Sequence, residues 1–245
     1  MAKRKLSRRQ AWRVQKIQDE RTERANKRAH LADQQLNEGE LGKEQLGLVI
    51  ANYGSEVDVE CQQGDETGNI NRCHLRANLG TPVTGDQVIW RSGNPTGVIV
   101  AVEPRRSELT RPDIQGKQRT IAANIDYIVI VLAPLPVPHY ELIDRYLVAA
   151  ESVSIKPLIL LNKFDLVTDE NRSRIEQLLA IYPELGYQVL EASTKSMNGL
   201  SALETILKDR ISVFVGQSGV GKSSLINHLI GRKKLYEMNA VISDT

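Results

Sequence analysis

The segment GQSGVGKS at residues 216–223 has residue types and spacing that suit the binding of phosphate groups. It fits the pattern G-x-x-x-x-G-K-[ST], in which glycines let backbone N–H groups turn toward an anion. The apolar run ISVFV precedes it and SLINHLI follows it, which predicts a strand, a loop and a helix in that order. We expect Lys222 to contact the outer phosphates and Ser223 to ligate Mg²⁺, as the two catalytic residues. The full expected phosphate site is Gly216, Gln217, Ser218, Gly219, Val220, Gly221, Lys222, Ser223 and Ser224.

Two polar segments follow other apolar runs and suit the recognition of a guanine base. NKFD at residues 162–165 follows PLILL, and its Asp165 can accept hydrogen bonds from both N1–H and the 2-amino group of guanine. Asn162 is expected to hold the loop, and the stem of Lys163 to cover the base. The segment Ser193, Thr194 and Lys195 resembles the SAK segment of GTP-binding proteins, in which a backbone N–H recognises the guanine carbonyl.

The order of these motifs differs from that of ordinary small GTPases. Here NKFD and STK precede the phosphate loop, whereas in small GTPases they follow it. Both orders can build the same sheet if the chain is circularly permuted. From residue 106 onward, alternating strands and helices predict an α/β P-loop domain with a parallel sheet. The expected strands are 127–132, 157–161, 188–191 and 212–215, and the expected helices are 140–152, 170–180, 199–209 and one from residue 222.

The pattern of residues 37–105 predicts a small β-barrel. Five short runs at 46–51, 56–62, 70–75, 87–90 and 97–102 are separated by turn-rich segments. This pattern favours an OB-type barrel, a fold that often binds oligonucleotides; a barrel used only as a spacer is the alternative. Tyr53 and Trp90 are its candidate base-stacking aromatics. The basic stretch that follows, with Arg105, Arg111 and Arg119, reads as an irregular solvated link.

The charge of the chain is divided unevenly. Residues 1–30 contain 11 Lys or Arg against three acidic residues, a net charge of +8, so the remainder carries −6 of the total of +2. The basic extension, residues 1–36, has few apolar residues, and it is either a solvated frayed tail or an arm that becomes ordered on RNA. A basic arm favours a polyanionic partner because neutralised phosphates release counterions.

Other classes of protein fit the sequence poorly. The longest apolar run, residues 125–137, is shorter than the roughly 20 residues that span a bilayer, and we expect no membrane partner. Residues 1–30 lack the apolar core of a secretory signal, so a cytoplasmic location is expected. Cys61 and Cys73 have no ligand-like neighbours in sequence and are expected to be buried thiols rather than zinc ligands.

The combination of a basic extension, a barrel containing TPVTGDQVIW, the link RRSELTRPD and permuted GTPase motifs resembles the ribosome small-subunit-dependent GTPase A family. The resemblance implies a monomeric factor that binds GTP or GDP and hydrolyses GTP during late maturation of the 30S ribosomal subunit. It also implies that the barrel and the extension contact 16S rRNA. Two alternatives stay open: a P-loop ATPase with an RNA-binding barrel, and a non-catalytic RNA-binding module with a regulatory nucleotide site.

The family pattern continues past the P-loop helix with segments that residues 1–245 do not show. They are a switch threonine, a D-x-P-G segment at the γ-phosphate and a Cys/His domain that binds Zn²⁺. Because these segments are needed to complete the catalytic site, the expectation is that this chain binds GTP but hydrolyses it poorly. Zn²⁺ is likewise expected only with that further domain.

Overall fold

The computed structural model describes residues 41–76, 79–113, 116–233 and 240–242. The chain divides into two compact units, residues 1–104 and 105–245, which are treated separately below. The predicted basic extension, residues 1–36, lies outside the described residues. No helix in the described ranges is both long and apolar enough to cross a membrane.

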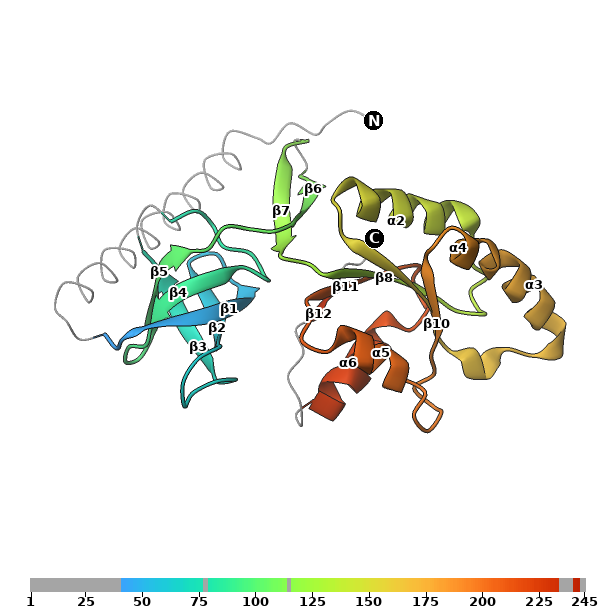
Figure 1. Cartoon of the computed structure of the whole chain (residues 1–245). Coiled ribbons are helices and arrows are strands. Elements are labelled where there is room, and N and C mark those ends of the chain that lie inside the picture. The colour runs from blue at the N-terminus through green and yellow to red at the C-terminus, as the bar shows by residue number, and fades with distance from the viewer. Residues whose placement is uncertain (1–40, 77–78, 114–115, 234–239, 243–245) are drawn as a thin grey trace, which may run out of the picture. The chain divides into compact units, whose positions relative to one another are not determined.

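The described part of the first unit is a closed five-stranded barrel (Figure 1). Its strands are β1 (Glu44–Asn52), β2 (Glu56–Cys61), β3 (Ile70–Leu75), β4 (Gln87–Arg91) and β5 (Gly97–Val102). They are ordered β1-β2-β3-β5-β4, and β4 closes on β1; only β3 and β5 pair in parallel. The predicted OB-type barrel is therefore confirmed, with each strand within two residues of its expected bounds.

The barrel interior is filled by side chains that alternate along the strands. In β2, Val57, Val59 and Cys61 are buried while the residues between them face outward. Trp90 of β4 is completely buried, so the prediction that its ring could stack on a nucleotide base is wrong. Gly47 on the neighbouring strand makes this possible, because a Cβ there would lie 2.8 Å from the indole ring. The indole fills the barrel core and has no exposed face for a nucleotide base.

The two cysteines are free thiols buried in the barrel, as the sequence predicts. Cys73 packs with Cys61 in the same hydrophobic core, and burial raises the pKa of its thiol to about 12. A thiol with so high a pKa stays protonated at neutral pH. It therefore acts as a small apolar side chain and not as a thiolate ligand.

The second unit is built on a parallel sheet with strand order β10-β9-β8-β11-β12. The strands are β8 (Tyr127–Leu132), β9 (Lys156–Leu161), β10 (Gln188–Glu191), β11 (Ser212–Val215) and β12 (Ala240–Ile242). The helices are α2 (Tyr140–Ser152), α3 (Asp169–Leu179), the short α4 (Ile181–Glu184), α5 (Ser201–Leu207) and α6 (Lys222–Lys233), with a 3₁₀ turn η1 (Phe164–Leu166) after β9. The predicted α/β fold is confirmed; α4 and β12 were not predicted.

Helices cover both faces of this sheet (Figure 1). Ile143 and Leu147 of α2 pack with Ile175 and Leu178 of α3 in one core, and α5 and α6 contribute Leu203 and Leu225 to a second core on the opposite face. The central strand β8 supplies side chains to both cores, which explains why the run YIVIVL is continuously apolar. Buried on both sides, the sheet gives the loops at its carboxyl edge a rigid base.

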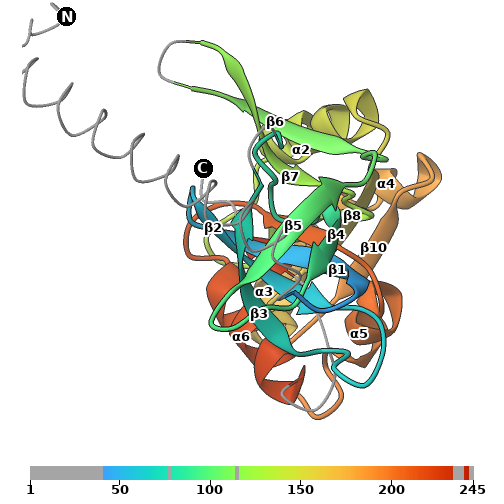
Figure 2. The same cartoon turned by 90° about the vertical axis from the view of Figure 1, so that its left-hand side faces the viewer.

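The basic link is a β-hairpin and not the irregular connection expected from sequence. Strand β6 (Glu108–Pro112) pairs antiparallel with β7 (Gln118–Ala123), and the hairpin extends away from the sheet of its unit (Figure 2). Asp113 organises the turn by accepting a hydrogen bond from the Lys117 backbone at 3.0 Å and pairing with Arg119 at 3.0 Å. The strands escaped prediction because they are short and rich in charged residues, with little apolar alternation.

Candidate functional site

The loop between β11 and α6 has a backbone that only glycine can adopt easily. Gly216, Gly219 and Gly221 all have positive φ angles. At Gly216 a Cβ would collide with the carbonyl oxygen of Val131 in β8, and at Gly221 it would lie 2.7 Å from Nδ2 of Asn162. The glycines of the pattern therefore serve two purposes: they turn the loop, and they let neighbouring strand ends approach it closely.

Lys222 lies at the start of α6 and is only 6% exposed. Its Nζ donates hydrogen bonds to the carbonyl oxygens of Gly216 at 2.9 Å and Gln217 at 3.0 Å. These bonds hold the ammonium group inside the curve of the loop, where it can meet an anion seated on the helix N-terminus.

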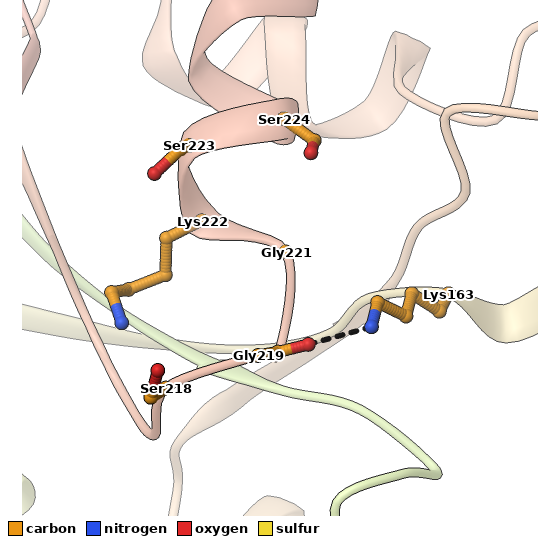
Figure 3. A pocket seen from close by; sticks show the side chains of 7 residues that line it. All are labelled: Lys163, Ser218, Gly219, Gly221, Lys222, Ser223 and Ser224. Atoms are coloured by element: carbon orange, nitrogen blue, oxygen red, sulfur yellow. Dashed lines mark hydrogen bonds between the residues drawn. The ribbon is translucent and has the colours of Figure 1, made fainter.

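A pocket of about 570 Å³ opens over this loop. Figure 3 shows Lys222 and Ser223 on one side of the loop and Lys163 on the other. The lining residues are Lys163, Ser218, Gly219, Gly221, Lys222, Ser223 and Ser224. Two lysines, three hydroxyl groups and a helix N-terminus make the pocket suitable for an anionic ligand of nucleotide size.

The segment after β9 is tied directly to this loop. Asn162 is buried, and its Nδ2 donates to the carbonyl oxygen of Val220 at 2.9 Å. Lys163 adopts a left-handed conformation with φ of 56°, and its Nζ donates to the carbonyl oxygen of Gly219 at 2.6 Å (Figure 3). The structure thus brings together two segments that are more than 50 residues apart in the sequence.

Asp165 lies in a small polar network with the segment after β10. Its Oδ1 accepts a hydrogen bond from Ser193 Oγ at 2.6 Å, and its Oδ2 lies 3.4 Å from Nζ of Lys195. The Ser193 hydroxyl in turn accepts a bond from the Lys195 backbone N–H at 3.2 Å. The hydrogen bond from Ser193 is the main cause that lowers the pKa of Asp165, and Lys195 adds to it. Asp165 is therefore a fixed, ionised acceptor at neutral pH.

The predicted residues do not all have the same position in this site. Val220 is 1% exposed and packs in the core under the loop, so it lines no part of the pocket. Gln217 contributes its backbone carbonyl to Lys222. Thr194 is half-buried between the two partners of Asp165. No motif in the sequence pointed to Pro136, whose Cδ would lie 3.8 Å from a Cβ at Gly219 and which therefore flanks the loop from the β8–α2 connection.

Among the described residues, no group of three or more His, Cys, Asp or Glu side chains is placed to hold a metal ion. The Ser223 hydroxyl is a hard oxygen ligand of the kind that Mg²⁺ accepts, and it lines the pocket beside Lys222. One protein hydroxyl suits a cation that is held mainly by water and by phosphate oxygens. The pocket therefore fits a metal that arrives with a nucleotide.

A family model described as RsgA GTPase matches residues 102–244, which is more than half of the chain. The chain belongs to the RsgA GTPase family. Proteins named small ribosomal subunit biogenesis GTPase RsgA from Azotobacter vinelandii and from Pseudomonas fluorescens strain SBW25 are each 58% identical to it over 231 residues. These alignments cover 94% of this chain and 67% of each relative, so the chain spans about two thirds of their length.

Solved structures of similar proteins agree with this assignment. YjeQ from Thermotoga maritima is 32% identical with a TM-score of 0.64, over 76% of this chain and 65% of that one. YloQ, described as a circularly permuted GTPase, is 31% identical with a TM-score of 0.63, over 76% of this chain and 64% of that one. The permuted motif order inferred from the sequence is thereby confirmed. GTPases of this kind use Mg²⁺ with GTP.

Proposed function

We propose that this protein is a GTPase that acts in biogenesis of the small ribosomal subunit, with the pocket over the P-loop as its GTP site. The observation that carries the proposal is the pair of hydrogen bonds from Asn162 and Lys163 to the P-loop. They tie the segment that carries Asp165 to the loop that carries Lys222, so one ligand can present a base to the first and phosphates to the second. The names and functions of the RsgA relatives support the same reading.

Guanine is the base that the Asp165 network suits. An ionised carboxylate accepts hydrogen bonds and cannot donate them, and guanine presents two adjacent donors, N1–H and the 2-amino group. Adenine presents no such pair. Ser193 and Lys195 hold the carboxylate in place, and we assign recognition of the base carbonyl to the Thr194 backbone N–H, because the Lys195 N–H already donates to the Ser193 hydroxyl.

At the other end of the site, we assign the phosphates to the backbone N–H groups of residues 216–224. Lys222 would stabilise charge on the outer phosphates, and Ser223 would hold Mg²⁺. The metal, when bound, neutralises charge that builds up between the β- and γ-phosphates. The Gly216 and Gln217 carbonyls orient Lys222 before the nucleotide arrives, so little reorganisation is needed on binding.

For the rRNA contact, the described residues favour the β6–β7 hairpin over the outer face of β2 and β3. That barrel face carries Glu56, Asp58 and Glu60, and Arg72 is already paired with Asp58 and lies 4.6 Å from the ring of Tyr53. On the hairpin, Arg111 lies directly opposite Arg119, and both are exposed. Like charges placed opposite each other are unfavourable, so nearby anions are stabilising; Asp113 supplies one to Arg119, and a phosphate would supply another to the pair. We assign a phosphate contact to this pair, alongside the basic extension.

The experiment that tests the nucleotide assignment is competition against a fluorescent GDP analogue on the chain of residues 1–245. GTP and GDP should displace the analogue, and ATP should fail to do so at about 100-fold higher concentration. Equal displacement by ATP would favour the P-loop ATPase alternative. Adding purified 30S subunits and measuring GTP turnover then tests for an enzyme, because stimulated turnover would exclude a module with a purely regulatory nucleotide site.

A further inference from the structure

A second pocket lies behind the base-recognition loop, on the side of the sheet covered by α3 and α4. Its volume is about 240 Å³, and its walls are mainly apolar, with Phe164, Ile175, Leu179 and Val189 among them. The nucleotide pocket lies over the P-loop and shares none of these residues. This cavity is therefore separate from the proposed GTP site.

Phe164 belongs both to the wall of the second pocket and to the segment proposed to recognise the base. It lies between Lys163, which bonds to the P-loop, and Asp165, which faces Ser193. The Phe164 backbone N–H donates to the Ala192 carbonyl at 3.0 Å, but its ring is only half-buried and forms part of the pocket wall. A ligand that filled the pocket would cover this ring and brace η1 in the position it has here.

The size and the rim of the pocket define the class of ligand. Drug-sized ligands occupy roughly 300–1,000 Å³, whereas benzene fits a cavity of about 150 Å³, so this pocket suits a body of one or two small rings. Its polar rim consists of Arg172, Glu176 and Glu191. Arg172 lies 3.9 Å from Glu176, and Glu191 is an exposed second carboxylate at the end of β10. One guanidinium and two carboxylates favour a ligand with a single positive charge.

We propose that this pocket binds a compact apolar ligand carrying one ammonium group, and that the bound ligand slows release of guanine nucleotide. The binding claim stands on the cavity alone, and the effect on release rests on the proposed GTP site. To the extent that slower release raises the equilibrium affinity for nucleotide, linkage requires bound nucleotide to raise the affinity for the amine by the same factor.

The first test titrates 2-phenylethylamine into the nucleotide-free chain of residues 1–245 and follows methyl resonances by NMR. Shifts should be concentrated at Ile175, Leu179 and Val189. Ala180→Leu places a larger side chain in the pocket and should weaken binding at least about tenfold; helical φ and ψ at Ala180 tolerate leucine. Ala149→Leu, at an exposed position of α2 outside the pocket, is the matched control and should bind as the parent does. Equal binding by the Ala180→Leu variant would overturn the site.

The second test isolates the charge. 2-Phenylethanol has nearly the same shape without the ammonium group, and it should bind about two- to fivefold more weakly, as expected for one partly exposed ion pair. Glu191→Gln should remove most of that difference. Equal affinities of amine and alcohol for the parent would overturn the assignment of a cationic ligand.

The third test measures release of a fluorescent GDP analogue with and without saturating amine. Release should slow several-fold in the parent and stay unchanged in Ala180→Leu. An unaltered rate in the parent would overturn the coupling through Phe164. If the parent binds the amine but no guanine nucleotide, it is the proposed function that fails, while the pocket assignment stands on the first test.

Discussion

At the scale of single residues, the site depends on side chains that are held by their neighbours before any ligand is present. Asp165 is bonded to Ser193, and Lys222 to two loop carbonyls. Such support limits the number of conformations that must be lost on binding. It also means that each of these residues can be tested by a change that alters its chemistry and leaves its volume nearly the same.

Replacing Asp165 by Asn should reverse the base preference of the site. The amide keeps the shape but presents a donor as well as an acceptor, and losing a charged acceptor costs about 1.5–3 kcal/mol, or about 10- to 200-fold in GTP affinity. Xanthine nucleotides, which carry an oxygen in place of the 2-amino group, should bind more tightly to the variant than to the parent. Competition by GTP and XTP measures both effects, with Glu170→Gln on the exposed start of α3 as control. Undiminished GTP binding would show that Asp165 does not read the base.

Replacing Lys222 by Ala should weaken nucleotide binding at least about tenfold, because the positive charge at the outer phosphates disappears. The fold should persist, since the two hydrogen bonds of the Lys222 ammonium group to the Gly216 and Gln217 carbonyls lie within a single loop. Nucleotide titration together with a thermal melt tests both statements. Lys208→Ala, an exposed lysine after α5, serves as control. Parent-like affinity and turnover would remove Lys222 from the site.

At the scale of elements, the β6–β7 hairpin is the clearest candidate among the described elements for contact with a polyanion. Arg111 and Arg119 lie opposite each other across the strands and are both exposed, so together they can contact a phosphate, with Asp113 as a competing partner of Arg119. The barrel strand β2, by contrast, presents three acidic residues outward. This difference predicts that charge changes on the hairpin matter more for RNA than aromatic changes on the barrel.

Neutralising the hairpin by Arg111→Gln with Arg119→Gln should weaken binding to 16S rRNA or to 30S subunits. The slope of log K against log salt should fall by about 1 to 2, since each lost phosphate contact accounts for roughly 0.7–0.9. The matched control is Arg145→Gln with Arg174→Gln, two exposed arginines on α2 and α3. Equal salt slopes for the two double variants would mean that the hairpin makes no phosphate contact with the RNA. GTP affinity should be the same in all of them.

At the scale of the whole molecule, the chain combines a basic N-terminal segment with a body of opposite net charge. Removing residues 1–30 takes away a net charge of +8 and leaves −6. We expect weaker binding to 30S subunits and a flatter salt dependence, with GTP affinity unchanged because no proposed nucleotide residue is removed. Co-sedimentation over a salt series measures this. A salt slope equal to that of the full chain would assign the RNA contacts to the hairpin and the barrel.

The sequence by itself determined the motifs and those elements that have a clear apolar pattern, because both depend on residues close together along the chain. Alternation in EVDVEC and continuous apolar character in YIVIVL gave strands β2 and β8 within a residue of their observed ends. The spacing of glycines and lysine in GQSGVGKS specified a loop that needs positive φ at fixed positions. Even the permuted order could be read directly, since it is a property of the sequence.

The tertiary structure decided how these elements pack and which side chains they bring into contact. The sequence suggested Trp90 as an aromatic that could stack on a base. In the closed barrel, however, its indole packs against Gly47 and is completely buried. The link forms a hairpin in which Asp113 holds the turn through the Lys117 backbone N–H and the Arg119 side chain, contacts that no apolar pattern in the sequence indicates. The bonds from Asn162 and Lys163 to the P-loop, and the pocket behind Phe164, exist only where parallel strands end side by side. Contacts between residues distant in sequence depend on packing of the whole sheet, and for that reason a single sequence without its fold could not supply them.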